Sequence, residues 1–255
     1  MPNLALVAAL EREIALLVKN WARTTRDYQG RTFTFFERDE MVLVCGGIGL
    51  EAARRASEAV IALYRPTLLY SVGFAGALDA SLHVGDIFSP AVVIDARDGS
   101  RMSLQGTRIG AGDGALLTFM AVADAKQKAK LAQAYGARAV DMEAAAVAAA
   151  ARAHGITFGA TKVISDGLEF EMPGMARFIN SNGQFRTASF VLFAASRPWL
   201  WKGVAALASN SRQAAQALSS HLERFCSDMA NATNPASDSP GPIVLPSALH
   251  TGGRE

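Results

Sequence analysis

At residues 138–147 the chain reads Arg138-Ala139-Val140-Asp141-Met142-Glu143-Ala144-Ala145-Ala146-Val147, which places two carboxylates in a stretch otherwise rich in alanine and valine. Chains normally keep carboxylates off buried surface, because an unpaired buried charge is strongly unfavourable. A second apolar run, Phe158–Ile164, ends in Ser165-Asp166-Gly167. The pattern indicates strand, helix and strand, with acids at the carboxyl ends of both strands. Ligands of open α/β sheets bind at that edge, so we expect the functional site there.

Short apolar runs alternate with amphipathic stretches along the chain, as is typical of βαβ units and an α/β fold. The expected strands are Leu4–Ala9, Arg31–Glu37, Met41–Cys45, Thr67–Gly73, Ile87–Ile94, Ala139–Met142 and Phe158–Ile164. The expected helices are Glu11–Val18, Leu50–Tyr64, Ala123–Tyr135, Glu143–His154 and Arg212–Phe225. The composition shifts to Asn, Pro, Ser, Asp and Gly near Ser227, so we expect one domain at 1–226 and a disordered tail at 227–255.

The bulk composition narrows the class of protein. A chain of 255 residues suits one α/β domain, and a net charge of +2 without a basic run argues against nucleic-acid binding. Cys45 and Cys226 show no metal-ligand spacing and are expected to be reduced thiols, which favours a cytoplasmic location. The four histidines also lack ligand spacing, so we expect no metal. No signal peptide and no apolar run of transmembrane length is recognised.

Several polar or glycine-bearing segments fall at expected strand ends. Gly46-Gly47-Ile48-Gly49 and Gly73-Phe74-Ala75-Gly76 each suit either a tight turn or close backbone approach to an anion. Asp141 and Glu143 can be read as a helix cap with a first-turn acid, and Asp166 as a turn residue. Glu13 alone can be a solvated helix residue. Because all of these positions converge on strand ends, we favour a ligand site.

These segments resemble the purine nucleoside phosphorylase/nucleosidase family over roughly residues 4–225. The motifs are Gly47-Ile48-Gly49, Val72–Gly76, Val84-Gly85-Asp86-Ile87, Val140–Ala144 and Ile164-Ser165-Asp166. The chain looks most like the branch of methylthioadenosine/S-adenosylhomocysteine nucleosidases. It also resembles the hopanoid-associated phosphorylases, for which removal of adenine from an adenosyl-hopane is proposed, through Asp166–Pro173 and Arg197–Trp201. The resemblance implies a single α/β domain with a mixed central sheet flanked by helices, no organic cofactor, and a homo-oligomer.

The resemblance also implies roles for individual residues in cleaving the N-glycosidic bond of a purine nucleoside. Asp166 matches the acid at N7 of the purine, and Ser165 orients it. Glu143 matches the carboxylate that binds the ribose hydroxyls, and Met142 packs on the ribose. A general acid contributes roughly 10²–10⁴-fold to such a rate. Phe74 and Met120, with Ala121 beside it, are expected to contact the substrate.

The nucleophile stays open between phosphate and water. Glu13 matches the glutamate that activates water in the nucleosidases, and Lys162 stands where they carry an arginine. Trimeric-type bacterial phosphorylases bind phosphate through an arginine and a serine that correspond here to Ser71 and Phe74. A different phosphate site could combine Arg12 and Lys162 with the turn containing Gly47.

We expect phosphorolysis of a 5′-substituted adenosine, with phosphate as cosubstrate, and carry two alternatives. One is a hydrolytic nucleosidase, and the other is a nucleoside-binding module without turnover. The aromatic run Phe190–Trp201 is open to two interpretations. It can be core or an oligomer interface, or it can be an apolar surface for a lipid-bearing substrate or a membrane.

Overall fold

The computed structural model describes residues 3–104, 112–170, 175–178, 180, 183–184, 186, 189–190, 193 and 201–233. The strands are β1 (Leu4–Ala8), β2 (Ala22–Tyr28), β3 (Arg31–Arg38), β4 (Met41–Cys45), β5 (Leu68–Ala77), β6 (Ile87–Phe88), β7 (Val92–Asp95), β8 (Arg101–Ser103), β9 (Ala115–Thr118), β10 (Ala137–Asp141) and β11 (Thr157–Asp166). The helices are α1 (Glu11–Ile14), the 3-10 helix η1 (Leu17–Asn20), α2 (Leu50–Tyr64), α3 (Ala125–Tyr135), α4 (Ala144–Ala153), the 3-10 helix η2 (Met175–Phe178) and α6 (Trp201–Thr233).

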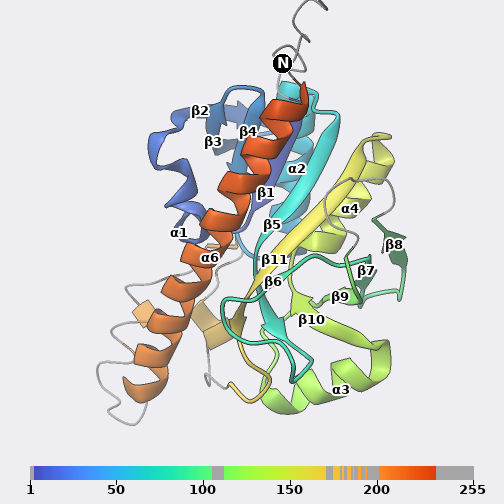
Figure 1. The fold of residues 1–255 in the computed structure, drawn as a ribbon, viewed down its shortest axis with the longest axis vertical. Coiled ribbons are helices and arrows are strands. Elements are labelled where there is room, and N and C mark those ends of the chain that lie inside the picture. Colours follow the sequence, from blue (N-terminus) through green and yellow to red (C-terminus); the bar gives the residue numbers. More distant parts are fainter. Residues whose placement is uncertain are drawn as a thin grey trace, which may run out of the picture.

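The strands form one mixed sheet in the order β2-β3-β4-β1-β5-β10-β9-β7-β8, with β11 paired to β5 and β6. Strand β1 is parallel to β4 and β5, whereas β5 is antiparallel to β10. The long strand β5 keeps β11 as a parallel neighbour along its length (Figure 1). Its other edge changes from β1 at the start of the strand to β10 at the end. The mixed α/β sheet that the resemblance implied is confirmed.

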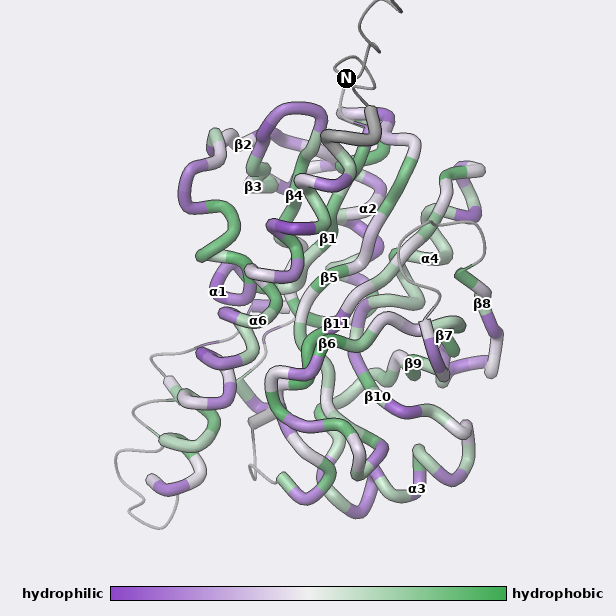
Figure 2. The backbone as a smooth tube through the Cα atoms, in the orientation of Figure 1, coloured by the Kyte–Doolittle hydropathy of each residue, from purple (hydrophilic) through white to green (hydrophobic). Residues whose placement is uncertain are grey.

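Helices cover both faces of the sheet. Helices α2 and α4 pack on one face, where the alanines of α4 allow a close approach to the strands. The helix α6 crosses the other face, where Leu218, Leu222 and Phe225 join the core formed with β1 and β5 (Figure 1). Hydrophobic residues follow the central strands, whereas the edge strand β2 is largely hydrophilic (Figure 2). This is the burial pattern expected of a sheet that is covered at its centre and exposed at its edge.

Some elements differ from those expected from the sequence. The run Ile87–Ile94 is two strands, β6 and β7, because Pro90 in the intervening segment has no N–H to donate to a ladder. Strands β2, β8 and β9 were not anticipated. The exposed pattern of β2 lacks the hydrophobic alternation that identifies a half-buried strand. The helix expected at Glu11–Val18 is the short α1 followed by η1.

The ends of β5 and α6 lie further along the chain than the sequence predicted. Strand β5 continues to Ala77, so Gly73–Gly76 lies inside a strand, and its interpretation as a turn was wrong. The helix expected at Arg212–Phe225 is the middle of α6, which extends to Thr233. Residues 227–233 are therefore helical rather than part of a disordered tail, and 234–255 lie outside the described residues. Within the described ranges, none of the helices combines the length and apolar character that a bilayer span requires.

Candidate active site

A buried lysine lies at the centre of the acids that the sequence singled out. Lys162 of β11 places Nζ 2.9 Å from Oδ2 of Asp141, and the two side chains are 1% and 0% exposed. Burial by itself lowers the pKa of Lys162, but Asp141, Glu143 and Glu13 outweigh it and raise that pKa. The lysine is thus a permanent cation whose charge is shared by three carboxyl groups.

Asp141 is held rigidly at the end of β10. Thr118 donates its hydroxyl to Oδ1 at 2.7 Å, and the backbone N–H of Ala144 donates to Oδ2 at 2.9 Å. The N–H of Ala145 donates in turn to the hydroxyl of Thr118 at 3.0 Å. Asp141 therefore accepts a hydrogen bond from the first residue of α4 and pairs with Lys162, while Glu143 occupies the N-cap position.

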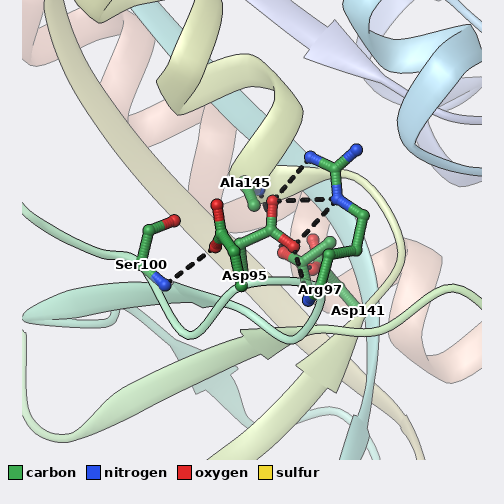
Figure 3. Close-up of polar contacts among 7 residues, drawn as sticks. Asp95, Arg97, Ser100, Asp141 and Ala145 are labelled. Carbon is green, nitrogen blue, oxygen red and sulfur yellow. Dashed lines mark hydrogen bonds and ion pairs between the residues drawn. The ribbon is translucent and has the colours of Figure 1, made fainter.

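Another acid, Asp95, ends β7, which is separated from the Asp141 strand β10 by β9; Figure 3 shows the polar contacts of Asp95. The guanidinium of Arg97 pairs with the carboxylate of Asp95 at 2.6 Å, and this hydrogen bonding lowers the pKa of Asp95. The backbone N–H of Asp95 also donates to the carbonyl of Ser100 at 2.9 Å. The ion pair with Arg97 and the hydrogen bond to Ser100 hold the loop that follows β7, so we assign Asp95 a structural role.

Glu143 reaches across from the start of α4 to the turn before α2. Its Oε1 accepts from the N–H of Gly49 at 2.7 Å, and its Oε2 accepts from the N–H of Met142 at 3.2 Å. Burial, followed by the charge of Asp141, raises the pKa of Glu143 to about 7 although Lys162 opposes the rise. Burial therefore opposes the ionisation of this carboxyl group, while two backbone N–H groups favour it.

Glu13 on α1 is buried with an unpartnered oxygen. The side chain is 5% exposed, and among the described residues its Oε2 has no hydrogen-bond partner. Burial raises the pKa of Glu13 to about 7, against the lowering effects of Lys162 and Arg12. Gly73 makes room for it, because a Cβ there would lie 2.7 Å from Oε2 and the backbone has φ of +139°. Glu13 is poised to exchange a proton with a bound molecule.

The turn at residues 46–49, which was expected to help bind phosphate, has its backbone N–H groups hydrogen-bonded within the protein. The N–H groups of Gly46 and Gly47 donate to the carbonyls of Ala8 and Ala9, each at 2.9 Å. Those of Ile48 and Gly49 donate to the Gly183 carbonyl at 2.6 Å and to Glu143 at 2.7 Å. Arg12 lies on the exposed side of α1. The amides of the Gly46–Gly49 turn are therefore engaged within the protein, and an anion site of Arg12 and Lys162 with the Gly47 turn stays a prediction.

Asp166 ends β11 and has a cation of its own that the sequence did not reveal. The hydroxyl of Ser165 donates to Oδ1 at 2.8 Å, while the ammonium of Lys128 on α3 pairs with Oδ2. Lys128 also donates to the carbonyl of Gly167 at 2.7 Å. The side chain of Lys128 is 1% exposed and that of Asp166 is 25% exposed, so Asp166 is the more accessible partner of the pair. Asp166 is an ion-pair residue rather than the turn residue of the alternative interpretation.

The remaining expected substrate contacts are less enclosed. Met142, Ser165 and Phe74 are half-buried, and Met120 is 63% exposed. Ser71 is fully buried and cannot meet a ligand as it stands. Of the aromatic run, Phe190 packs on Phe178 at 5.4 Å between ring centroids, which supports the core interpretation there. Residues 171–174, 191–192 and 194–200 of these motifs lie outside the described residues.

Lys128 had little sequence signal, because it sits among Lys126 and Lys130 in what looks like a solvated helix face. It is nevertheless the buried residue of α3, whereas the other two are exposed. In the part of the chain that the structure describes, His, Cys, Asp and Glu side chains form no group of three suited to a metal ion.

A family model described as "Phosphorylase superfamily" matches residues 3–125 and 114–192 of the chain. A 5′-methylthioadenosine/S-adenosylhomocysteine nucleosidase of Halalkalibacterium halodurans is 35% identical over 91 residues, which is 34% of this chain and 39% of the relative. The matched segment thus spans about two fifths of that relative.

Solved structures are similar over more of the chain. A nucleosidase of the same name from Neisseria meningitidis, in complex with methylthio-immucillin-A, has a TM-score of 0.62 at 19% identity and covers 86% of this chain and 96% of that one. Another from Colwellia psychrerythraea, in complex with adenine, has a TM-score of 0.53 at 25% identity and covers 65% and 84%.

Proposed function

The chain belongs to the phosphorylase superfamily, and on that premise we propose that it cleaves the N-glycosidic bond of a purine nucleoside by hydrolysis. The proposed substrate is an adenosine substituted at the 5′ position. Relatives and solved structures named as 5′-methylthioadenosine/S-adenosylhomocysteine nucleosidases support hydrolysis over the phosphorolysis first expected.

The buried, unpartnered carboxyl oxygen of Glu13 is the observation that carries the proposal. A general base is most effective when its pKa lies near the working pH, and burial raises the pKa of Glu13 to about 7. Glu13 would take a proton from water as the water oxygen bonds to C1′ of the ribose. A pure binding module has no need of such a group, which argues against the third alternative.

The charge around Glu13 also favours water over phosphate. Three buried acids, Glu13, Asp141 and Glu143, surround a single buried ammonium, that of Lys162. An incoming phosphate dianion would meet this excess of carboxylates, and like charges disfavour one another in a weakly screened site. The engaged amides of 46–49 offer no compensating donors. Water is neutral and carries no such penalty.

The remaining roles follow the geometry. Glu143 would accept hydrogen bonds from the ribose hydroxyls, an interaction that strengthens as positive charge develops on the sugar. Asp166 would interact with the purine as the C1′–N9 bond breaks. Glu13 lies beside Gly73 of β5 and Asp166 lies beside Gly76 of the same strand.

The nature of the 5′ substituent, including an adenosyl-hopane, stays a prediction from the sequence. So do assembly into a homo-oligomer, a cytoplasmic location and a membrane-facing role for Phe190–Trp201.

Adenine release tests the proposal directly. Adenosine, 5′-methylthioadenosine and a hydrophobic 5′-alkyl adenosine would each be incubated with the protein, with and without phosphate. We expect adenine and free sugar at a rate that phosphate does not change. A sugar phosphate formed only when phosphate is present would establish phosphorolysis instead. Tight binding of 5′-methylthioadenosine without adenine release would indicate a binding module.

A further inference from the structure

The segment that follows β11 returns to the turn that holds Glu143. The backbone N–H of Ile48 donates to the carbonyl of Gly183 at 2.6 Å, and Gly183 is buried. The next residue of the turn, Gly49, donates its N–H to Oε1 of Glu143 at 2.7 Å. The contact with Gly183 thus lies one residue from the N–H that holds the carboxylate proposed to bind the ribose.

Asn180, Gly183 and Gln184 form a closed turn, which we call the Asn180 turn. Gly183 donates its N–H to the carbonyl of Asn180 at 3.0 Å, and Asn180 donates its N–H to the carbonyl of Gln184 at 3.0 Å. The N–H of Gln184 donates in return to Oδ1 of Asn180 at 2.9 Å. Gly183 has φ of +74°, a backbone conformation that favours glycine. The turn therefore holds its own shape, and Asn180 is the residue that closes it.

An aromatic cluster anchors this turn. The ring of Phe178 lies 5.4 Å from that of Phe190 and 5.2 Å from that of Phe193, measured between centroids, and Phe178 and Phe190 are buried. The N–H of Arg186 donates to the carbonyl of Phe178 at 2.8 Å, which joins the two ends of the turn. Packed aromatic rings stabilise the base of the turn, so the place of its buried glycine is defined by the fold.

Gly183 acts on a single peptide group. The carbonyl of Ile48 and the N–H of Gly49 belong to the same peptide unit, which is planar, so rotating one end rotates the other. A Cβ at Gly183 would clash with that carbonyl oxygen and would lie 2.7 Å from the nitrogen of Ile48. Glycine at position 183 therefore allows the Asn180 turn to pack against this peptide. Its position determines the direction in which the Gly49 N–H points toward Glu143.

Other contacts hold the first half of the turn at 46–49. The guanidinium of Arg31 on β3 donates to the carbonyl of Gly46 at 2.7 Å. Around Gly49, by contrast, the described part of the chain leaves space, because a Cβ there would meet no atom within 4 Å. The Asn180 turn therefore supports the one peptide of 46–49 on which the orientation of Glu143 depends.

We propose that the Asn180 turn is a positioning element that directs the Gly49 N–H at Glu143 and so fixes how this carboxylate meets the ribose hydroxyls. This inference rests on the proposed function, in which Glu143 binds the ribose. A carboxylate held in one orientation distinguishes a ribose from a 2′-deoxyribose, because the missing hydroxyl leaves a buried acceptor without its donor. The Asn180 turn therefore sets how strongly the site selects the ribonucleoside.

Rates on two nucleosides measure this selection. The value of kcat/KM for adenine release would be determined for 5′-methylthioadenosine and for its 2′-deoxy counterpart, and their ratio compared between variants. A hydrogen bond to a charged group accounts for roughly 10–100-fold, so Gly183→Ala should lower the ratio about tenfold from that of the wild type. The loss should fall on the ribonucleoside. Comparing ratios between variants cancels the different intrinsic lability of the two glycosidic bonds.

Matched variants separate positioning from a general disturbance of the fold. Gly155→Ala carries a similar backbone penalty, with φ of +66°, but its Cβ would meet no atom of the described residues within 4 Å. It should keep the wild-type ratio. Asn180→Ala removes the oxygen that accepts from Gln184 and should lower the ratio, whereas Asn180→Asp keeps an acceptor and should retain it. The two Asn180 variants carry the test if Gly183→Ala does not fold.

Glu143→Gln distinguishes a failure of this inference from a failure of the proposed function. It should lower the ratio at least as far as Gly183→Ala does. If Glu143→Gln keeps the wild-type ratio, or if wild-type protein releases no adenine, the proposed function is refuted. If Glu143→Gln lowers the ratio while Gly183→Ala and Asn180→Ala leave it unchanged, the role of the Asn180 turn is overturned. An Asn180→Asp protein as defective as Asn180→Ala would overturn it as well.

Discussion

The two ends of the site differ in how their acids are compensated. Around Glu13, three carboxyl groups share the ammonium of Lys162, and burial raises the pKa of both Glu13 and Glu143 to about 7. At the other end, Asp166 has Lys128 to itself and a hydroxyl on its second oxygen. The carboxyl groups with a raised pKa therefore gather around Lys162, whereas Asp166 is held in an ion pair of its own.

Removing the carboxyl group of Glu13 should have the largest effect. Glu13→Gln should lower kcat for adenine release by roughly 10²–10⁴-fold, because an amide cannot take the proton of the attacking water. Affinity for 5′-methylthioadenosine should change little. Glu11→Gln is the matched control, since Glu11 lies on the same helix but is exposed beside Arg23. A Glu13→Gln protein with wild-type kcat would remove Glu13 from the mechanism.

Removing the shared cation should affect stability most. Lys162→Met leaves Asp141 buried without its partner and should lower the free energy of unfolding by about 3–5 kcal/mol in denaturant titrations. Lys128→Met should lower it less, because Asp166 is partly exposed and solvent can screen its charge. Asp141→Asn combined with Lys162→Met should recover much of the loss. Equal losses for the two lysines would contradict the difference between the two ends.

Glu13→Gln should also stabilise the fold at high pH. The native pKa of about 7 lies above the ordinary value of 4.5, so ionised Glu13 destabilises the native state. This penalty is absent below pH 4.5, grows between 4.5 and 7, and is complete above 7. The variant should gain about 3 kcal/mol in free energy of unfolding at pH 8 and under about 1 kcal/mol at pH 5. A gain in the free energy of unfolding that does not vary with pH would contradict the raised pKa of Glu13.

Two glycines of β5 allow each end to be disturbed separately. Gly73→Ala places a Cβ 2.7 Å from Glu13 and requires φ of +139°, so it should lower the free energy of unfolding by about 1–3 kcal/mol. Gly76→Ala meets Asp166 at 2.8 Å without that backbone penalty and should destabilise less. Unfolding titrations of both variants check this order. If Gly76→Ala proves the more disruptive, the leaving-group end is the more tightly packed of the two.

The pH dependence of kcat should report the nucleophile end. With substrate bound, kcat should fall about tenfold per pH unit below about pH 7 as the base takes up a proton. Burial raises the pKa of both Glu13 and Glu143 to about 7, so the decrease of kcat at acidic pH reports the two groups together. Steady-state rates at saturating 5′-methylthioadenosine between pH 5 and 8.5 measure it. A kcat that stays constant down to pH 5 would show that neither acid titrates in the complex.

Much of this arrangement was accessible from residue order. Hydrophobic periodicity located β1, β4 and α2, and the apolar runs ending in Asp141 and Asp166 marked the edge of the sheet where the acids gather. Short or polar strands were missed, because β2 and β8 carry no buried alternation. The break between β6 and β7 was not predicted, although Pro90 lacks the N–H that a continuous strand would need.

Residue order was enough to predict the α/β class, the acids at the strand ends and the resemblance to nucleoside-cleaving enzymes. Which charged groups come into contact became visible only in the folded protein. In the fold, the amides of 46–49 are hydrogen-bonded within the protein, Oε2 of Glu13 has no hydrogen-bond partner among the described residues, and Lys128 pairs with Asp166 from a helix whose sequence suggests a solvent-exposed face. The reason is physical: the ionisation of a side chain depends on burial and on charges within a few ångströms, and residues 38 positions apart become neighbours only when the chain folds.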